Sequence, residues 1–314
     1  MRPPLPHGTN RSSPVERPSV KSLKRRRRGI GIAPIAGIAI LLYLLVLVYP
    51  LLAGAFLSFT NASPLGGTFA FIGVKNYVQL FGDTQLGTSL LFTGITALAV
   101  TVIANLVGLL FALLLNKPTR NYRLMRTLIF IPQVLSGIVV GFIWRSIFTS
   151  DGLLNSVLIN LHVISAPVSW IGNPTLATAC IMLVVIWTTT AFSTVVFSAS
   201  LQTVPLELYE AARMDGANAF RRFTNVTWPM IAPGLTICVT LSLITSFKLY
   251  DVIAALTGGG PFGSTESAAF YVIQEAFTNN FFGYSSAIAV VLLLLTAAVA
   301  FAASALLRRR ESQI

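Results

Sequence analysis

The stretch PLELYEAARMDGANAFRRFTNVTWP, residues 205–229, decides how this chain is organised. It separates two long apolar runs, LATACIMLVVIWTTTAFSTVVFSASL at 176–201 and IAPGLTICVTLSLITSFKLYDVIAAL at 231–256. Its charged residues keep it out of a bilayer, while its Ala, Leu and Glu content is typical of helix rather than of a bare polar linker. We therefore expect a structured connector between two membrane spans.

The order of residues within this connector predicts two short helices. Pro205 suits the first turn of a helix, and Glu207 and Glu210 complement the positive end of the helix dipole there. Asp215-Gly216 ends that helix, because Gly accepts a positive φ. The predicted product is a helix–turn–helix knuckle with helices at 206–214 and 217–226.

The overall composition places the chain in a membrane. Hydrophobic residues make up 54% of the 314 positions and charged residues only 10%, which leaves too little polar surface for a water-soluble globule. The formal net charge of +12 is concentrated, since nine of the 22 Lys and Arg residues lie in the first 28 positions. That clustering favours a juxtamembrane tail over nucleic-acid binding. Cys180 and Cys238 lie in apolar segments without a CxxC or His-rich context, so we interpret them as packing residues and expect no metal site.

Six segments are apolar over the roughly 20 residues that a bilayer crossing takes. We predict an all-α membrane protein with six transmembrane helices and the knuckle between the fourth and the fifth. The expected organisation is a disordered basic cytoplasmic tail at 1–29, a transmembrane domain at 30–307 and a cytoplasmic tail at 308–314. The predicted spans are 30–59, 88–115, 127–148, 176–201, 231–256 and 284–307.

The positions of Lys and Arg predict the orientation, because cytoplasmic loops retain positive charge. With the N-terminal tail inside, the inside segments hold 19 of the 22 Lys and Arg residues. Both termini are therefore predicted to be cytoplasmic, in a multi-pass protein of the cell membrane. The outside loops are short and rich in turn residues, and the last of them, 257–283, is expected to hold an interfacial helix at about 268–277.

The knuckle resembles the EAA loop of the permease subunits of binding-protein-dependent ABC importers. The matching positions are Glu210, Ala211, Ala212, Asp215, Gly216, Ala217, Phe223, Pro229 and Pro233. This chain departs from the family at Val226-Thr227-Trp228-Pro229, where Ile-x-Leu-Pro is usual, and Trp228 is a conservative change because it suits an interfacial anchor. The resemblance implies that the knuckle is a coupling helix that docks on an ATPase subunit.

Two further motifs resemble the carbohydrate branch of these permeases. They are FIGVKNY at 71–77, and SFKLYD at 246–251 followed by LTGGGP at 256–261. Over residues 30–307 the chain resembles the maltose-type first permease subunit. It implies an importer that moves a di- or oligosaccharide into the cytoplasm, and glycerol phosphate derivatives remain an alternative cargo.

The same resemblance implies the partners. They are a second, distinct permease in a heterodimer, a pair of ATPase subunits, an extracytoplasmic solute-binding protein, the sugar and membrane lipid, with no nucleic acid. The chain has no Gly-x-x-x-x-Gly-Lys-Ser/Thr phosphate loop, so we expect it to be no enzyme itself. It is expected to bind no cofactor, while ATP and Mg are used by the partner ATPase subunits.

Two semi-polar stripes are candidates for the substrate path. Hydroxyls at helical spacing can bond to sugar hydroxyls, and an aromatic side chain such as Phe192 can pack on the sugar ring. The resemblance places both stripes at pore-lining positions of maltose-type permeases, although Ser and Thr also serve helix packing in membranes. The stripes are Val185, Thr188, Thr189 and Phe192 in span four, and Ser242, Thr245, Ser246 and Leu249 in span five.

Charges inside the spans are few. Lys248 and Asp251 lie one turn apart in span five and are predicted to form an ion pair or to line an aqueous cavity, because an unpaired charge is costly at that depth. Arg145 is expected to reach the interface with its guanidinium. A secondary transporter would need buried carboxylates or broken helices within the spans, and an enzyme would need a His, Cys or Asp constellation. Asp251 is the only carboxylate within the predicted spans, and no catalytic constellation is present in them. A secondary transporter and an enzyme are therefore both less favoured.

Overall fold

The computed structural model describes residues 32–66, 70–116 and 119–311, and the predicted tail at 1–29 lies outside them. The described chain is helical, and its only extended pairing is an isolated bridge between Thr60 and Phe71. The helices are α1 (Ile32–Tyr43), η1 (Leu44–Val48), α2 (Tyr49–Leu57), α3 (Lys75–Leu80), α4 (Thr84–Leu114), α5 (Arg120–Val134), α6 (Gly137–Phe148), α7 (Leu153–Asn160), α8 (Pro174–Gln202), α9 (Leu206–Met214), α10 (Ala219–Arg222), η2 (Phe223–Thr227), α11 (Trp228–Met230), α12 (Ala232–Phe247), α13 (Asp251–Leu256), α14 (Ala268–Phe277) and α15 (Phe282–Glu311).

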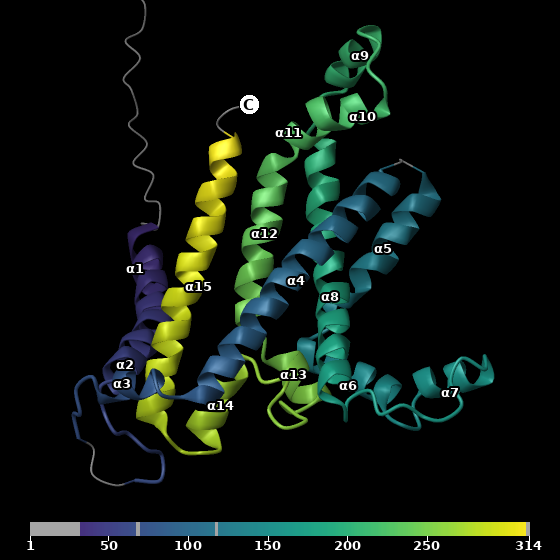
Figure 1. Cartoon of the computed structure of the whole chain (residues 1–314). Coiled ribbons are helices and arrows are strands. Elements are labelled where there is room, and N and C mark those ends of the chain that lie inside the picture. The colour runs from purple at the N-terminus through teal and green to yellow at the C-terminus, as the bar shows by residue number, and fades with distance from the viewer. Residues whose placement is uncertain (1–31, 67–69, 117–118, 312–314) are drawn as a thin grey trace, which may run out of the picture. The chain divides into compact units, whose positions relative to one another are not determined.

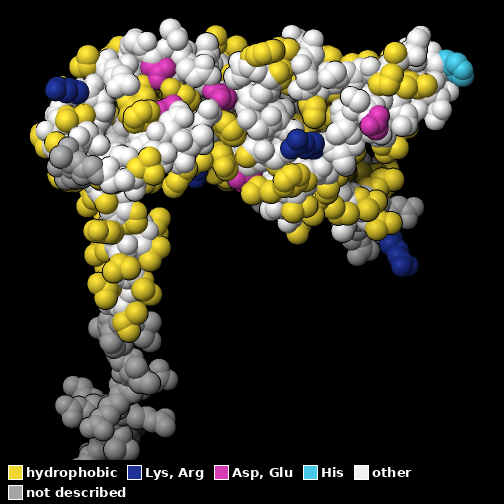
Figure 2. All heavy atoms as spheres, turned by 90° about the horizontal axis from the view of Figure 1, so that it is seen from below, with side chains coloured by type: hydrophobic (Ala, Val, Ile, Leu, Met, Phe, Trp, Pro, Cys, Tyr) yellow, Lys and Arg dark blue, Asp and Glu magenta, His cyan; other side chains and the backbone are white. Residues whose placement is uncertain are grey.

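The chain divides into two compact units, Met1–Pro50 and Leu51–Ile314. In the first unit, α1 and η1 form one continuous helical stretch that is apolar on every side. None of its described residues is buried, and Figure 2 shows this stretch covered in hydrophobic side chains where it leaves the grey N-terminal residues. A helix that is apolar on every side is typically surrounded by lipid or by other helices rather than by water.

The second unit is a bundle organised around α4. This helix packs along α8 and α12, and α12 packs in turn on α15 (Figure 1). The contacts are close because small residues lie between the helices: a Cβ added at Gly108 of α4 would stand 2.6 Å from the Cβ of Ser193 of α8. Small residues at membrane helix interfaces let the backbones approach in this way.

The two ends of the bundle differ. One end, here called the knuckle end, carries α9, α10, the junction of α4 with α5 and the end of α15 (Figure 1). The other, here called the loop end, carries α13, α14 and the starts of α4 and α15. Figure 2 views the loop end, where charged side chains are scattered among polar and hydrophobic ones.

Five helical segments are long and apolar enough to span a membrane: Ala36–Leu57, Thr84–Leu114, Gly137–Asn160, Pro174–Gln202 and Phe282–Arg309. A sixth arises if the pair Ala219–Met230 and Ala232–Phe247, bent by 65°, counts as one span. The prediction of an all-α membrane protein is thus confirmed, and the predicted number of six spans is reached when the bent pair is counted as one. The helix expected at about 268–277 is also confirmed, as α14.

The structure corrects the predicted third and fifth spans, which are not continuous helices. The segment 127–148 is divided between α5 and α6, because Leu135 is extended and Ser136 caps α6 by accepting a hydrogen bond from the N–H of Val139. Pro132 lies in the last turn of α5 and cannot donate a backbone hydrogen bond there. The segment 231–256 is also divided, between α12 and α13, although no side chain caps the start of α13.

The second halves of these two broken segments pack against each other. Helices α6 and α13 meet through small residues, since a Cβ added at Gly141 would stand 2.6 Å from the Cβ of Ala255. The guanidinium of Arg145 on α6 donates a hydrogen bond of 3.4 Å to the carbonyl of Ala255. Arg145 therefore helps to hold the helix pair together.

Candidate functional site: the knuckle and the helices that carry it

The first helix of the knuckle forms where it is predicted, as α9, and ends in a turn that needs glycine. Gly216 has φ +73°. Its N–H donates to the carbonyl of Arg213 at 3.0 Å, and the N–H of Ala217 donates to the carbonyl of Ala212 at 2.9 Å. This is the Schellman arrangement of a helix C-terminus, in which the left-handed residue is usually glycine.

The second helix starts two residues later than predicted, at Ala219 instead of Ala217. The cause is Asn218, whose side-chain oxygen accepts the N–H of Arg221 at 2.9 Å and caps the helix. Helices α10, η2 and α11 then continue to Met230, where the chain bends into α12. The predicted helix–turn–helix shape is confirmed, with this shift in its second part.

The knuckle is attached firmly to the helices beneath it. The hydroxyl groups of Tyr209 on α9 and Thr227 on η2 are 3.0 Å apart, which joins its two arms. The rings of Phe223 and Trp228 lie 6.1 Å apart. Tyr209 and Phe223 pack on a buried cluster shared by α4, α8 and α12, consisting of Leu109, Ala112, Phe197, Leu201, Val204, Ile231 and Cys238. The knuckle is therefore in packed contact with three long helices.

The outer surface of the knuckle is uncovered and partly apolar. Leu206, Met214 and Phe220 are 67%, 87% and 73% exposed. Glu210, Ala211, Asp215 and Gly216 are also exposed, whereas Ala212, Ala217, Phe223 and Pro229 are half-buried. Large apolar side chains that are exposed on a projecting element are typical of a protein-docking surface.

The two predicted stripes are only partly available to a substrate. Val185 and Leu249 belong to one buried cluster, and Ser242 and Ser246 are 1% and 2% exposed, so these four lie within the packing of this chain. Thr188, Thr189 and Phe192 are half-buried and Thr245 is exposed. The hydroxyls of Thr188 and Thr245 donate to carbonyls of their own helices and retain acceptor capacity.

A buried polar network explains Ser242. Asn105 of α4 accepts a hydrogen bond of 2.8 Å from the hydroxyl of Ser193 on α8, and its amide donates to the carbonyl of Thr101 at 2.6 Å and to Ser242 on α12 at 3.4 Å. One asparagine thus ties together three helices. The sequence analysis missed Asn105, although a lone amide in an apolar helix is a usable signal of such a contact.

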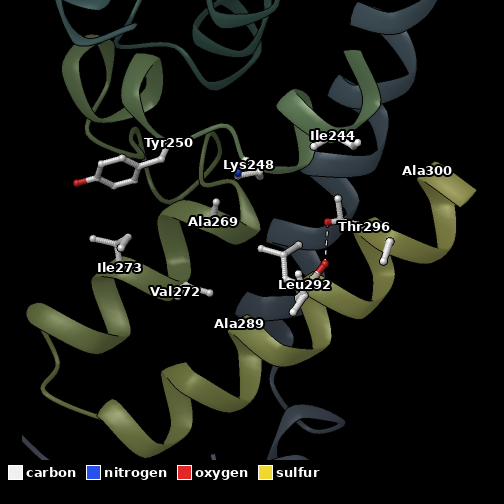
Figure 3. A pocket seen from close by; sticks show the side chains of 12 residues that line it. Ile244, Lys248, Tyr250, Ala269, Val272, Ile273, Ala289, Leu292, Thr296 and Ala300 are labelled. Carbon is white, nitrogen blue, oxygen red and sulfur yellow. Dashed lines mark hydrogen bonds between the residues drawn. The ribbon is translucent and has the colours of Figure 1, made fainter. Parts of the chain in front are cut away.

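Lys248 and Asp251 do not form the predicted ion pair; no ion pair joins them within the described ranges, because the break between α12 and α13 separates them. Lys248 lies at the C-terminal end of α12, where the helix dipole favours a cation. The carboxyl group of Asp251 instead lies beside Gly137 at the N-terminal end of α6, where the dipole favours an anion. Lys248 contributes to an apolar groove of about 550 Å³ between α12, α14 and α15 (Figure 3).

The loop end is held together by a carboxylate and two tyrosines. Asp83 caps α4 by accepting the N–H of Leu86 at 3.0 Å, and its other oxygen accepts the hydroxyls of Tyr271 at 2.8 Å and Tyr284 at 2.5 Å. Burial raises the pKa of Asp83, but the hydrogen bonds from Tyr284, Leu86 and Tyr271 outweigh it, so the pKa lies below its ordinary value. Burial and the bond to Asp83 raise the pKa of Tyr271. These contacts join α4 to α14 and α15 across more than half of the sequence.

Among the described residues, no three His, Cys, Asp or Glu side chains come close enough together to hold a metal ion. Cys180 and Cys238 are both free and buried. The described chain thus offers an interaction surface and packed membrane helices.

The described helices thus define a multi-pass membrane protein with an uncovered knuckle at one end. The chain belongs to the family of binding-protein-dependent transport system inner membrane components, whose model matches residues 104–312. The members of this family are transmembrane permease subunits of ABC importers.

Relatives agree with this assignment, and a solved structure shares the fold. The chain is 31% identical over 239 residues to the probable starch degradation products transport system permease protein AmyD of Thermoanaerobacterium thermosulfurigenes, covering 75% of this chain and 79% of the relative. It is 35% identical over 198 residues to the trehalose/maltose transport system permease protein MalF of Thermococcus litoralis, covering 63% and 66%. A chain of a bacterial ABC transporter involved in the import of the acidic polysaccharide alginate superposes with a TM-score of 0.78 at 18% identity, covering 88% of this chain and 95% of that one.

Proposed function

We propose that this chain is one of two transmembrane subunits of an ATP-driven importer that brings a neutral di- or oligosaccharide into the cytoplasm. Family membership carries the proposal. The cargo is inferred from the relatives, whose names refer to starch degradation products and to trehalose and maltose. The broken third and fifth segments do not favour a secondary transporter in this setting, because α6 and α13 bury each other in a packed pair.

In the proposed orientation the knuckle end is cytoplasmic. The start of α5, the knuckle and the end of α15 lie at this same end (Figure 1), and these segments carry most of the arginines beyond the N-terminal tail. Arg126 is fixed there by donating to the carbonyl of Leu115 at 2.5 Å and 3.1 Å. This arrangement supports a cytoplasmic C-terminus, and the predicted basic tail at 1–29 supports the same side for the N-terminus.

The knuckle is proposed to couple the permease to a pair of separate ATPase subunits, which supply the ATP and Mg chemistry. Glu210, Ala211 and the apolar residues Leu206, Met214 and Phe220 supply the uncovered surface. The contacts of Tyr209 and Phe223 with the cluster beneath then transmit a movement of the ATPase pair to α4, α8 and α12. Such transmission requires an element with two arrangements that ATP binding and hydrolysis favour differently.

For the substrate path, the proposal retains Thr188, Thr189, Phe192 and Thr245, which keep exposed surface. A second permease, proposed to be a distinct chain, would complete the path, and an extracytoplasmic binding protein would deliver the sugar at the loop end. The described charges disfavour a phosphorylated cargo, because Arg145 is engaged with Ala255 and Lys248 lies in an apolar groove.

The test is affinity purification of the tagged chain in mild detergent, identification of the co-purifying proteins, and reconstitution of the complex in liposomes. We expect a second permease and an ATPase with a phosphate-binding loop, and ATP-dependent uptake of maltose or trehalose when the cognate binding protein is added. Uptake by the isolated chain without ATP would refute the importer assignment. ATP-dependent uptake of glycerol 3-phosphate alone would replace the proposed cargo.

A further inference from the structure

A second, polar pocket lies at the loop end, apart from the candidate path on α8 and α12. Its volume is about 300 Å³. It shares Tyr250 and Ile273 with the apolar groove of Figure 3, where these two side chains lie at one end of that groove. The remaining side chains of the pocket are mostly polar, so Tyr250 and Ile273 separate two chemically different spaces. The pocket is lined by Tyr250, Gly258, Glu266, Phe270, Gln274 and Thr278, together with Ile273.

Two acceptor groups in the wall of this pocket have spare capacity. Glu266 is only 7% exposed and accepts one hydrogen bond, 2.5 Å long, from the amide of Gln85; within the described ranges no Lys or Arg forms an ion pair with it. A carboxylate has room for about four such bonds. The side-chain oxygen of Gln274 is buried without a partner. Buried acceptors that lack donors are costly in a folded protein, and a ligand rich in hydroxyl groups would supply the donors.

Two of the lining side chains, Tyr250 and Phe270, are aromatic. The rings of Tyr250 and Phe270 are stacked, with centroids 5.7 Å apart and an interplanar angle of 28°. A pocket that combines an aromatic surface with hydrogen-bonding groups suits a pyranose ring, which has C–H groups on its face and hydroxyls at its edge. The volume is at the lower limit of small-molecule sites, which favours one sugar ring over a chain of them.

The pocket is preformed by the glycine-rich turn that follows α13. Gly259 has φ +84°, and a Cβ at this position would stand 2.8 Å from the ring of Phe270 and 2.9 Å from the side chain of Glu266. The hydroxyl of Thr265 donates to the carbonyl of Gly260 at 2.6 Å and fixes the turn. The backbone is thus wrapped tightly around the two side chains that supply the carboxylate and one of the rings.

We propose that this pocket is an entry subsite that takes one neutral sugar ring before the sugar reaches the membrane helices. This inference rests on the proposed function, which makes the loop end extracytoplasmic and the cargo a sugar. Glu266 disfavours an anionic ligand, so the subsite also selects against phosphorylated compounds. Glu266 and Gln274 bind the sugar hydroxyls, and Tyr250 and Phe270 pack on its face.

The test uses the importer purified as a complete complex in lipid nanodiscs, without ATP and without the binding protein. Binding of maltose, trehalose and glycerol 3-phosphate is measured by saturation-transfer difference NMR for the parent and for Glu266→Gln and Gln274→Ala. The matched control is Glu275→Gln. Like Glu266, Glu275 is 7% exposed and accepts one side-chain hydrogen bond, in its case from Asn279, and it follows Gln274 on α14, but it does not line the pocket. Assembly of each variant with its partners is checked by size-exclusion chromatography.

We expect each pocket variant to weaken the binding of maltose or trehalose about tenfold, while Glu275→Gln leaves it unchanged. Should Glu266→Gln fail to assemble, Gln274→Ala decides, since its side-chain oxygen has no structural partner to lose. Two results would overturn the subsite: unchanged sugar binding in the pocket variants, or no sugar binding to the parent complex. If the parent still takes up sugar, either result leaves the proposed function standing. A complex that takes up no sugar at all refutes the proposed function, and the subsite with it.

Discussion

Gly216 is the position at which the proposed coupling can be tested with the least ambiguity. Its φ is +73°, and nothing lies within 4 Å of the place where a Cβ would be. A substitution there consequently acts through the backbone and not through a clash. For a residue with a Cβ the left-handed conformation costs about 1–2 kcal/mol, which lowers the equilibrium constant for the native turn about 5–30-fold.

Three variants separate backbone strain from other effects. Gly216→Ala carries the strain of a Cβ, and Gly216→Asn is the matched control, because Asn tolerates the left-handed region far better than other residues. Gly216→Pro cannot adopt the turn, because proline fixes φ near −65° and lacks the N–H that donates to Arg213. The expected order of coupling is parent, Asn, Ala and then Pro.

The assay is reconstitution of the complete complex in liposomes, with sugar uptake and ATP hydrolysis measured on the same preparation. We expect Gly216→Pro to insert normally but to lose at least tenfold in sugar transported per ATP, with Gly216→Ala intermediate. Parental uptake per ATP in Gly216→Pro would refute the coupling role of the knuckle. A loss in Gly216→Asn as large as in Gly216→Pro would refute the explanation by backbone conformation.

Three further predictions concern the packing that carries the knuckle and the loop end. Asn105→Leu is expected to destabilise the protein by about 1–3 kcal/mol, because it leaves the hydroxyl of Ser193 without its acceptor inside the bundle. Reversible unfolding in SDS measures this loss of stability, and an unchanged unfolding midpoint would contradict the prediction. Gly141→Val is expected to cost about 1–3 kcal/mol by the same assay, since a Cβ there meets that of Ala255 at 2.6 Å. At Gly94 of α4 a Cβ meets nothing within 4 Å, so Gly94→Ala should cost no stability, because Ala favours the helix over Gly. The lowered pKa of Asp83 adds stability above its ordinary value of 3.8, and this contribution disappears as the pH falls through the lower native value. Asp83→Asn should therefore lose stability at pH 7 and flatten the fall in Tm below about pH 4, and an identical pH profile in both proteins would show that this cap contributes nothing.

Local chemistry made much of the fold predictable. The apolar runs were long enough to identify the spans, and Pro205, Asp215 and Gly216 have conformational preferences strong enough to place α9 and its turn. The start of α10 was wrong by two residues, because the capping strength of Asn218 was not considered. The breaks at Leu135 and after Phe247 were missed, because each segment is apolar enough on average to span a membrane and a hydropathy pattern cannot distinguish one long helix from two short ones.

For the candidate site, too, some features could be predicted from the sequence and others only from the folded structure. By itself the sequence determined that the chain is a helical membrane protein, that a knuckle joins two of its segments, and which residues of the knuckle resemble a coupling loop, since all of these depend on hydropathy and on neighbours a few positions apart. Only the tertiary structure decided that Ser242 serves Asn105 instead of an open path, that Lys248 and Asp251 stabilise different helix ends, and that Glu266 meets Gln85 in a pocket. Those contacts join residues up to 181 positions apart. Which residues meet depends on how the helices pack, and no local pattern of residues specifies that packing.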